Sequence, residues 1–137
     1  MKRRVLFTYQ MLTGLSDTST GAMLIVAPEL TLRLMRLHAA PEALPYLSFV
    51  GTFVLSVGLS CLYGGYLAYC GACAEKQLSV VWLLTAITRS SVAIFVVTKI
   101  LSGSLEAGWL TVAVFDAAFA LVQVIGLRKG WLLDAAK

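Results

Sequence analysis

Four long apolar stretches occupy most of the sequence and constrain its fold more than any other feature. They run over about residues 5–27, 44–69, 78–101 and 107–127. A helix crosses the hydrocarbon core of a bilayer with about 20 apolar residues, roughly twice the length of a membrane-barrel strand. Hydrophobic residues make up 59% of the chain and charged residues only 13%, against about 25% charged residues in soluble domains. The sequence therefore predicts one all-α domain, an integral-membrane four-helix bundle, and excludes a soluble monomer.

The first stretch has a second interpretation. Lys2-Arg3-Arg4 followed by apolar residues resembles the start of a signal peptide, but Gln10 and Asp17 interrupt the apolar region that such a peptide needs. We therefore interpret residues 5–27 as a membrane span that ends at Pro28.

A short amphipathic segment follows this span. Within Glu29–His38, Leu30, Leu34 and Leu37 repeat at helical spacing, and charged residues repeat at the same spacing on another face. This pattern predicts a short interfacial helix between the first two spans.

Basic residues predict the orientation. With both termini cytoplasmic, the short inner segments hold more Lys and Arg than the outer ones, as membrane proteins prefer. The inner residues are Lys2, Arg3, Arg4, Lys76, Arg128, Lys129 and Lys137, and the outer ones are Arg33, Arg36 and Lys99. The net charge of +4 does not indicate nucleic-acid binding, because these residues form no stripe or aromatic-interleaved patch.

Three charged residues lie near the middle of predicted spans, and they are Asp17, Arg89 and Asp116. An ionised side chain at the bilayer centre costs at least about 2.5 kcal/mol on insertion scales, so we expect the three to face the bundle and meet. The planar guanidinium of Arg89 has donors enough for both carboxylates. The sequence thus predicts a buried Asp-Arg-Asp cluster.

Polar and small residues extend the faces that carry these charges. We expect five of them to line a ligand site, namely Gln10, Gly14, Thr85, Trp109 and Gln123. The alternative is that the polar residues and the charges only fix helix packing, since interhelical polar contacts average only about 0.6 kcal/mol.

Glycines recur every seven residues in the second stretch, at Gly51, Gly58 and Gly65. This spacing favours close packing against another helix, with the flat wall of a ligand pocket as the alternative. Cys70 and Cys73 have the spacing of a redox pair, but the predicted topology places them in the reducing cytoplasm. No set of ligands for a metal is evident, and we expect no cofactor.

The chain resembles the small four-span DoxX-like bacterial membrane proteins. The residues that carry this resemblance are Gly14, Gly21 and Pro28 in the first stretch, the glycines of the second, Arg89 in the third and Asp116 in the fourth. The resemblance implies a multi-pass protein of the bacterial inner membrane, some relatives being linked to quinone-dependent sulfur oxidation or redox defence. It assigns no catalytic residue here.

Three classes of function suit these features. We expect an accessory protein in the bilayer that binds a lipophilic small molecule or a partner membrane subunit. An alternative is a membrane-embedded enzyme of the epoxide hydrolase, cyclase or isomerase type, in which Asp17 and Asp116 act as acid and base and Arg89 orients them. The further alternative is proton-coupled transport by a homo-oligomer, in which the mid-span acids carry protons.

Overall fold

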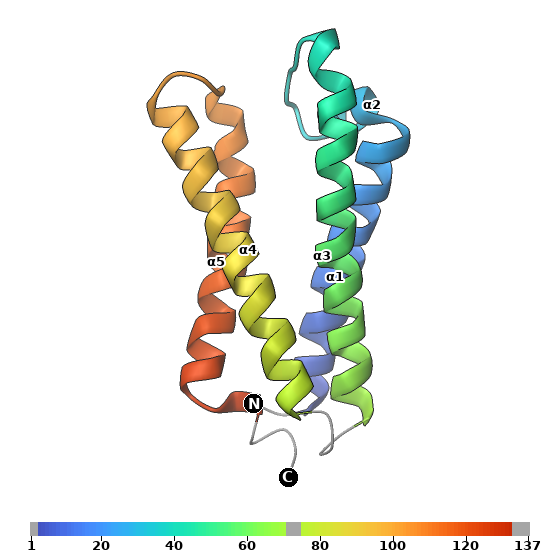
Figure 1. Cartoon of the computed structure of the whole chain (residues 1–137), viewed down its shortest axis with the longest axis vertical. Coiled ribbons are helices and arrows are strands. Elements are labelled where there is room, and N and C mark those ends of the chain that lie inside the picture. Colours follow the sequence, from blue (N-terminus) through green and yellow to red (C-terminus); the bar gives the residue numbers. More distant parts are fainter. Residues whose placement is uncertain (1–2, 71–74, 133–137) are drawn as a thin grey trace. The chain divides into compact units, whose positions relative to one another are not determined.

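Helices are the regular secondary structure of the described residues, and short turns connect them. The computed structural model describes residues 3–70 and 75–132. The long helices are α1 (Arg3–Val26), α3 (Leu44–Cys70), α4 (Glu75–Leu101) and α5 (Leu110–Arg128), and the short elements are α2 (Pro28–Leu34), η1 (Pro41–Ala43) and η3 (Ala107–Trp109) (Figure 1). The all-α prediction is confirmed.

Among the described residues, three helical segments are long and apolar enough to cross a membrane, and they are Pro41–Cys70, Lys76–Leu101 and Ala107–Arg128. Helix α1 has 24 residues, which is sufficient length, but it is not among these three. Its middle carries the polar run Ser16–Thr20, which lowers its hydropathy. Three of the predicted spans are therefore supported as membrane helices, and the span over residues 5–27 stays a prediction.

Helix α2 is shorter than the segment predicted for the interfacial helix. It ends at Leu34 instead of continuing to His38. Arg36 has a φ of 56°, which is outside the helical range, and the Leu37 amide donates to the Leu32 carbonyl at 2.9 Å across this turn. This hydrogen bond satisfies a carbonyl at the helix end and stops the helix.

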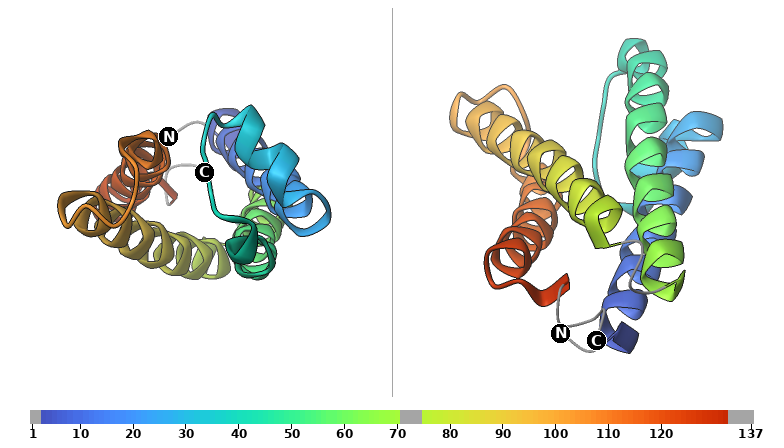
Figure 2. Two further views of the ribbon diagram at one scale, coloured as in Figure 1. Left: turned by 90° about the horizontal axis from the view of Figure 1, so that it is seen from above. Right: turned by 60° about the horizontal axis from the view of Figure 1, so that its bottom comes forward.

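The chain divides into two compact units, which we describe separately. The first unit, Phe7–Tyr66, is called the α1–α3 unit. The second unit, Leu67–Lys137 with Met1–Leu6, is called the α4–α5 unit. In the first unit α1 and α3 run side by side in opposite directions, and α2 follows the end of α1 (Figure 2).

Glycines bring α1 and α3 into close contact. A Cβ added at Gly21 would lie 2.7 Å from the Leu55 Cα, and one added at Gly14 would lie 2.8 Å from the Leu62 nitrogen. The glycines of α3 meet α1 in the same way, at Gly51, Gly58 and Gly65. The prediction that this glycine repeat packs against another helix is confirmed.

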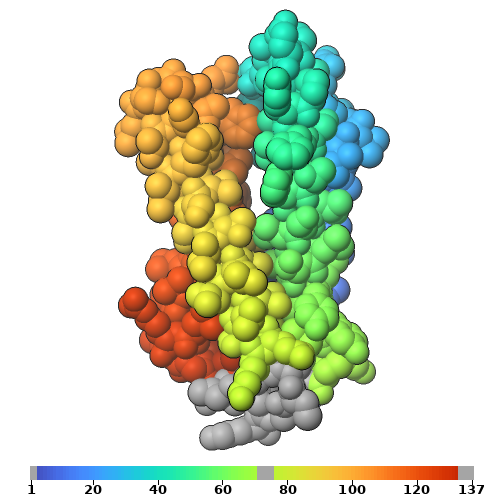
Figure 3. Space-filling view, in the orientation of Figure 1, coloured from blue at the N-terminus to red at the C-terminus, as the bar shows by residue number. Residues whose placement is uncertain are grey.

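Helices α4 and α5 form an antiparallel hairpin. The turn between them contains Gly103, whose φ of 71° suits glycine, which has no Cβ to clash there. One face of α4 carries exposed apolar side chains, among them Ile87, Ile94 and Phe95. Figure 3 shows part of the surface of this helix, in yellow and orange. Such a face suits contact with lipid tails, and the opposite face of α4 carries the polar residues described next.

Candidate functional site

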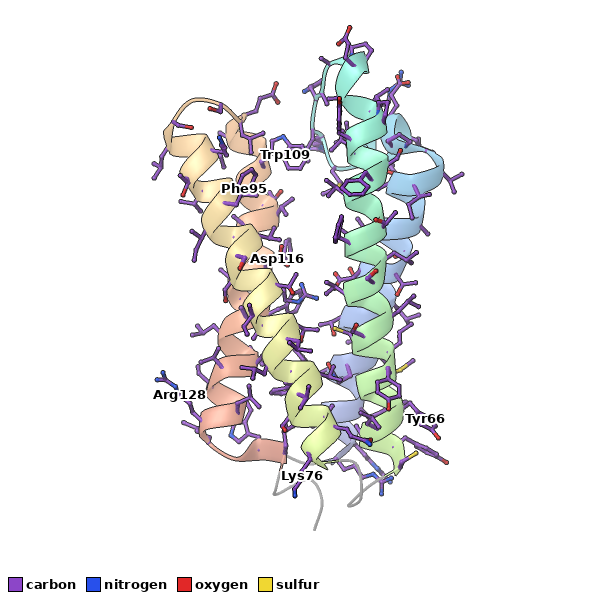
Figure 4. All side chains as sticks on the ribbon, viewed as in Figure 1. Tyr66, Lys76, Phe95, Trp109, Asp116 and Arg128 are labelled. Atoms are coloured by element: carbon purple, nitrogen blue, oxygen red, sulfur yellow. The ribbon has the colours of Figure 1, made fainter. Side chains whose placement is uncertain are left out.

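An ion pair joins the middles of α4 and α5. The Nη1 atom of Arg89 lies 2.7 Å from Oδ1 of Asp116, and the two side chains are 4% and 18% exposed. Figure 4 shows Asp116 between Trp109 and Arg128, which mark the two ends of α5. The prediction that Asp116 holds Arg89 is confirmed.

Helical spacing adds an aromatic contact to this pair. Phe119 lies one turn after Asp116 on α5, and the guanidinium carbon of Arg89 lies 5.0 Å from the centre of its ring. A cation over an aromatic face is attracted by the ring quadrupole, more strongly where water is excluded. Asp116 and Phe119 thus both stabilise the charge of Arg89 within an apolar helix pair.

A second polar contact lies on the same faces. Gln123 follows Asp116 by seven residues on α5, and Thr85 precedes Arg89 by four residues on α4. The Nε2 group of Gln123 donates to Thr85 Oγ1 at 2.9 Å, and both side chains are buried. The Thr85 hydroxyl in turn donates to the Val81 carbonyl at 2.8 Å. The helix pair therefore carries two polar contacts at two depths.

Two buried amide side chains retain unused hydrogen-bonding capacity. Gln123 is 1% exposed, and its Oε1 accepts no hydrogen bond from any described residue. Gln10 on α1 is fully buried, and neither Oε1 nor Nε2 has a partner within residues 3–70 and 75–132. A buried polar atom without a partner costs about 1–3 kcal/mol. A hydrogen-bonding group that reached these amides would therefore remove part of this free-energy cost.

Sequence reasoning missed one layer of this helix pair. Trp82 is completely buried, and a Cβ added at Gly126 would overlap its ring. Trp82 lies three residues before Thr85, and Gly126 lies three residues after Gln123, so the contact continues the same two faces. A signal was present, because Gly126 extends the spacing of small and polar residues on α5.

Three sequence-predicted site residues lie in the α1–α3 unit. Gln10, Gly14 and Asp17 are all on α1, and Gly14 is buried against Leu62 of α3. Asp17 is half-buried, beside the point where Gly58 of α3 meets α1. Their roles in binding or catalysis, and the place of Asp17 beside Arg89, stay predictions.

Trp109 lies in η3 just before α5, seven residues before Asp116, which corresponds to about 10 Å along a helix.

Cys70 is exposed at the end of α3, and Cys73 lies outside the described residues. The placement of this pair in the reducing cytoplasm, which argues against a redox role, stays a prediction. Within residues 3–70 and 75–132, no three His, Cys, Asp or Glu side chains gather as metal ligands.

Comparison with known proteins finds no matching family model, no matching characterised protein and no matching solved structure. The resemblance to DoxX-like proteins therefore stays a prediction.

Proposed function

We propose that this chain is a multi-pass protein of the inner membrane in which α1, α3, α4 and α5 cross the bilayer and both termini are cytoplasmic. The apolar segments of α3, α4 and α5 support three of these crossings. The proposal for α1 rests on its length and on its packing against α3 through Gly14 and Gly21. Gln10 and Thr13 of α1 are buried as well, so these polar side chains are kept away from lipid.

We further propose that the α4–α5 unit binds the polar group of a lipophilic molecule. The binding residues, called the polar row, are Thr85, Arg89, Asp116 and Gln123. The observation that carries this proposal is the buried Oε1 of Gln123, which accepts no hydrogen bond from the described residues. Residues that only hold two helices together are expected to satisfy each other's hydrogen bonds. A ligand group would satisfy this atom.

The hydrogen bonds around Gln123 indicate which hydrogen-bonding group such a ligand needs. Thr85 donates its proton to the Val81 carbonyl and accepts from Gln123 Nε2. The Gln123 amide keeps a second N–H on Nε2 and the unused acceptor Oε1, and a ligand that satisfies Oε1 needs a hydrogen-bond donor, such as a hydroxyl group. Its apolar part would lie among the apolar residues of the helices.

Two matched probes test this proposal. Dodecyl alcohol and dodecyl methyl ether have similar apolar chains, but only the alcohol donates a hydrogen bond. We expect the alcohol to raise the melting temperature of the protein in nanodiscs and the ether to raise it much less. If neither probe binds, the α4–α5 unit holds no such molecule. If both bind equally, a site exists, but Gln123 does not select the donor.

Two variants localise the effect. Gln123→Leu removes the acceptor and should abolish the difference between the probes. Val114→Leu changes an exposed apolar residue on the same helix and should leave the difference intact. Native mass spectrometry of the membrane-extracted protein would show whether a lipophilic molecule is retained from the cell.

The acid-base enzyme is the second candidate, and the partial exposure of Asp116 favours it. Its carboxylate is 18% exposed, whereas its partner Arg89 is only 4% exposed. A partly accessible carboxylate held by an arginine suits activation of water for attack on a lipophilic epoxide. Incubation with epoxydodecane in ¹⁸O-labelled water would yield a labelled diol, and Asp116→Asn would stop its formation. Absence of diol would exclude this reaction, and transport by an oligomer stays a prediction.

A further inference from the structure

Exposed basic residues gather at one end of the α4–α5 unit. They are Arg3 and Arg4 at the start of α1, Lys76 at the start of α4, and Arg128 and Lys129 at the end of α5. Because α4 and α5 are antiparallel, the start of one lies at the same end of the unit as the end of the other (Figure 4). We call this set the basic end.

Specific contacts hold part of the basic end in place. The Nε group of Arg3 donates to the Ala68 carbonyl at 2.8 Å, and its guanidinium lies 5.9 Å from the centre of the Tyr69 ring. Ala68 is in the last turn of α3, where carbonyls lack partners within the helix. Arg3 thus satisfies the end of α3 while it remains an exposed residue.

The position of these charges along the helices corresponds to the depth of lipid headgroups. Arg128 and Lys129 directly follow the apolar part of α5, and Lys76 precedes that of α4. Tyr69 is 70% exposed at the same end, and tyrosine is enriched at the boundary between hydrocarbon and water. The cations are therefore within reach of phosphate groups when the helices lie in a bilayer.

Charge is distributed unequally between the two ends of this unit. At the opposite end, the exposed charged residues are Lys99 and Glu106, which cancel. The sequence next to the basic end also contains Glu75 and Asp134 against Lys2 and Lys137, so this end keeps its positive excess. An anionic surface would be attracted to one end of the unit only.

We propose that the basic end binds the headgroups of anionic phospholipids and prefers them to zwitterionic ones. Guanidinium groups form paired hydrogen bonds with phosphate oxygens, and ammonium groups add compact charge. Zwitterionic headgroups carry a phosphate as well, but their own cation cancels its field. This inference does not depend on the ligand proposed for the polar row.

Nanodiscs that contain equimolar phosphatidylglycerol and phosphatidylcholine provide the test. Native mass spectrometry after release should show phosphatidylglycerol retained in excess on the wild-type protein. Lys129→Gln should lower this excess by about fivefold, which corresponds to about 1 kcal/mol for one cation near the surface. Arg128→Gln with Lys129→Gln should lower it further, and higher salt should lower it in the wild type.

Lys99→Gln is the matched control, because it removes one exposed lysine from the opposite end of the same unit. It should leave the excess unchanged. Equal retention of both lipids by the wild type, or an equal loss in Lys99→Gln and Lys129→Gln, would overturn the proposal. A rise in melting temperature with inorganic phosphate in pure phosphatidylcholine nanodiscs, equal to the rise with phosphatidylglycerol, would show that the site takes free phosphate instead of lipid.

Discussion

The α1–α3 unit and the α4–α5 unit use different chemistry to hold two apolar helices together. In the first, glycines allow the backbones to approach, as at Gly21 beside Leu55. In the second, polar side chains join the helices, at Arg89 with Asp116 and at Thr85 with Gln123. Lipid gives no hydrophobic drive for helices to associate, so each pair needs one of these sources of attraction. The comparison teaches that only the polar solution creates groups that can also act on a ligand.

The largest effect should come from removing the cation of the polar pair. Arg89→Leu leaves the Asp116 carboxylate without its partner in an apolar helix pair, and loss of one member of a buried pair costs about 3–5 kcal/mol. Unfolding in detergent measures this loss. Arg89→Leu with Asp116→Leu should recover much of the stability, because apolar residues replace both charges. Lys99→Leu, at an exposed position of the same helix, should change stability little. Failure of the double variant to recover would show that Arg89 also stabilises a group other than Asp116, as the sequence predicts for Asp17.

A smaller effect is expected from adding one methyl group to each unit. A Cβ at Gly58 would lie 2.5 Å from Thr18 Oγ1 and overlap the Thr18 backbone nitrogen. Overpacking of this kind costs about 1–3 kcal/mol, so Gly58→Ala should lower the melting temperature. Gly126→Ala should lower it as well, because its Cβ would overlap the ring of Trp82, which is completely buried and cannot move without repacking α4 against α5.

Ser60→Ala is the control for Gly58→Ala on α3, because Ser60 is exposed and its hydroxyl bonds only within the helix. If Gly58→Ala and Ser60→Ala melted at the same temperature, α1 and α3 would not pack through the glycines, and the contrast between the units would fail.

The features that the sequence predicts are those whose absence would cost much free energy. Arg89 and Asp116 were expected to meet because an unpaired charge at mid-span is expensive, and the structure joins them at 2.7 Å. The glycine repeat of α3 was expected to pack because only small residues permit close backbones. Residue pattern alone was therefore sufficient for the ion pair and for one helix face.

Features whose alternatives differ little in free energy could not be predicted in the same way. Several polar groups lay within reach of Gln123 by spacing alone, and only the structure identifies Thr85 as its partner. The end of α2 depends on the left-handed backbone conformation of Arg36. Arginine rarely adopts this conformation, and the neighbouring residues do not indicate it. The contact of Trp82 with Gly126 needed the relative rotation of α4 and α5, which the sequence leaves open.

Asp17 offers a sharper test of the comparison between the two units. If Asp17 shares Arg89, as the sequence predicts, Asp17→Asn and Arg89→Leu should be non-additive by at least about 0.5 kcal/mol in a double-mutant cycle. The same cycle with Ser19→Ala, at an exposed residue of α1, should be additive. Additivity for Asp17 would restrict the charge cluster to Arg89 and Asp116.

The smallest effect on stability concerns the contact between Thr85 and Gln123. Thr85→Val takes away the acceptor of Gln123 Nε2 and should cost about 0.6 kcal/mol, the average for polar contacts between membrane helices. Thr88→Val, which removes an exposed hydroxyl bonded only to Leu84 of the same helix, is its control.

Gln123→Leu removes that same contact, but it also removes the buried Oε1 that has no partner among the described residues. Thr85 keeps its hydrogen bond to Val81 in this variant, so the ligand-free protein should be as stable as the wild type or slightly more stable. Dodecyl alcohol should then stabilise the wild type and leave Gln123→Leu unchanged. A clear loss of stability in ligand-free Gln123→Leu, with equal stabilisation of both proteins by the alcohol, would mean that Gln123 only holds the helices together. A buried polar atom that lowers stability is expected above all at functional sites, so a stable ligand-free Gln123→Leu would favour a binding role for this atom.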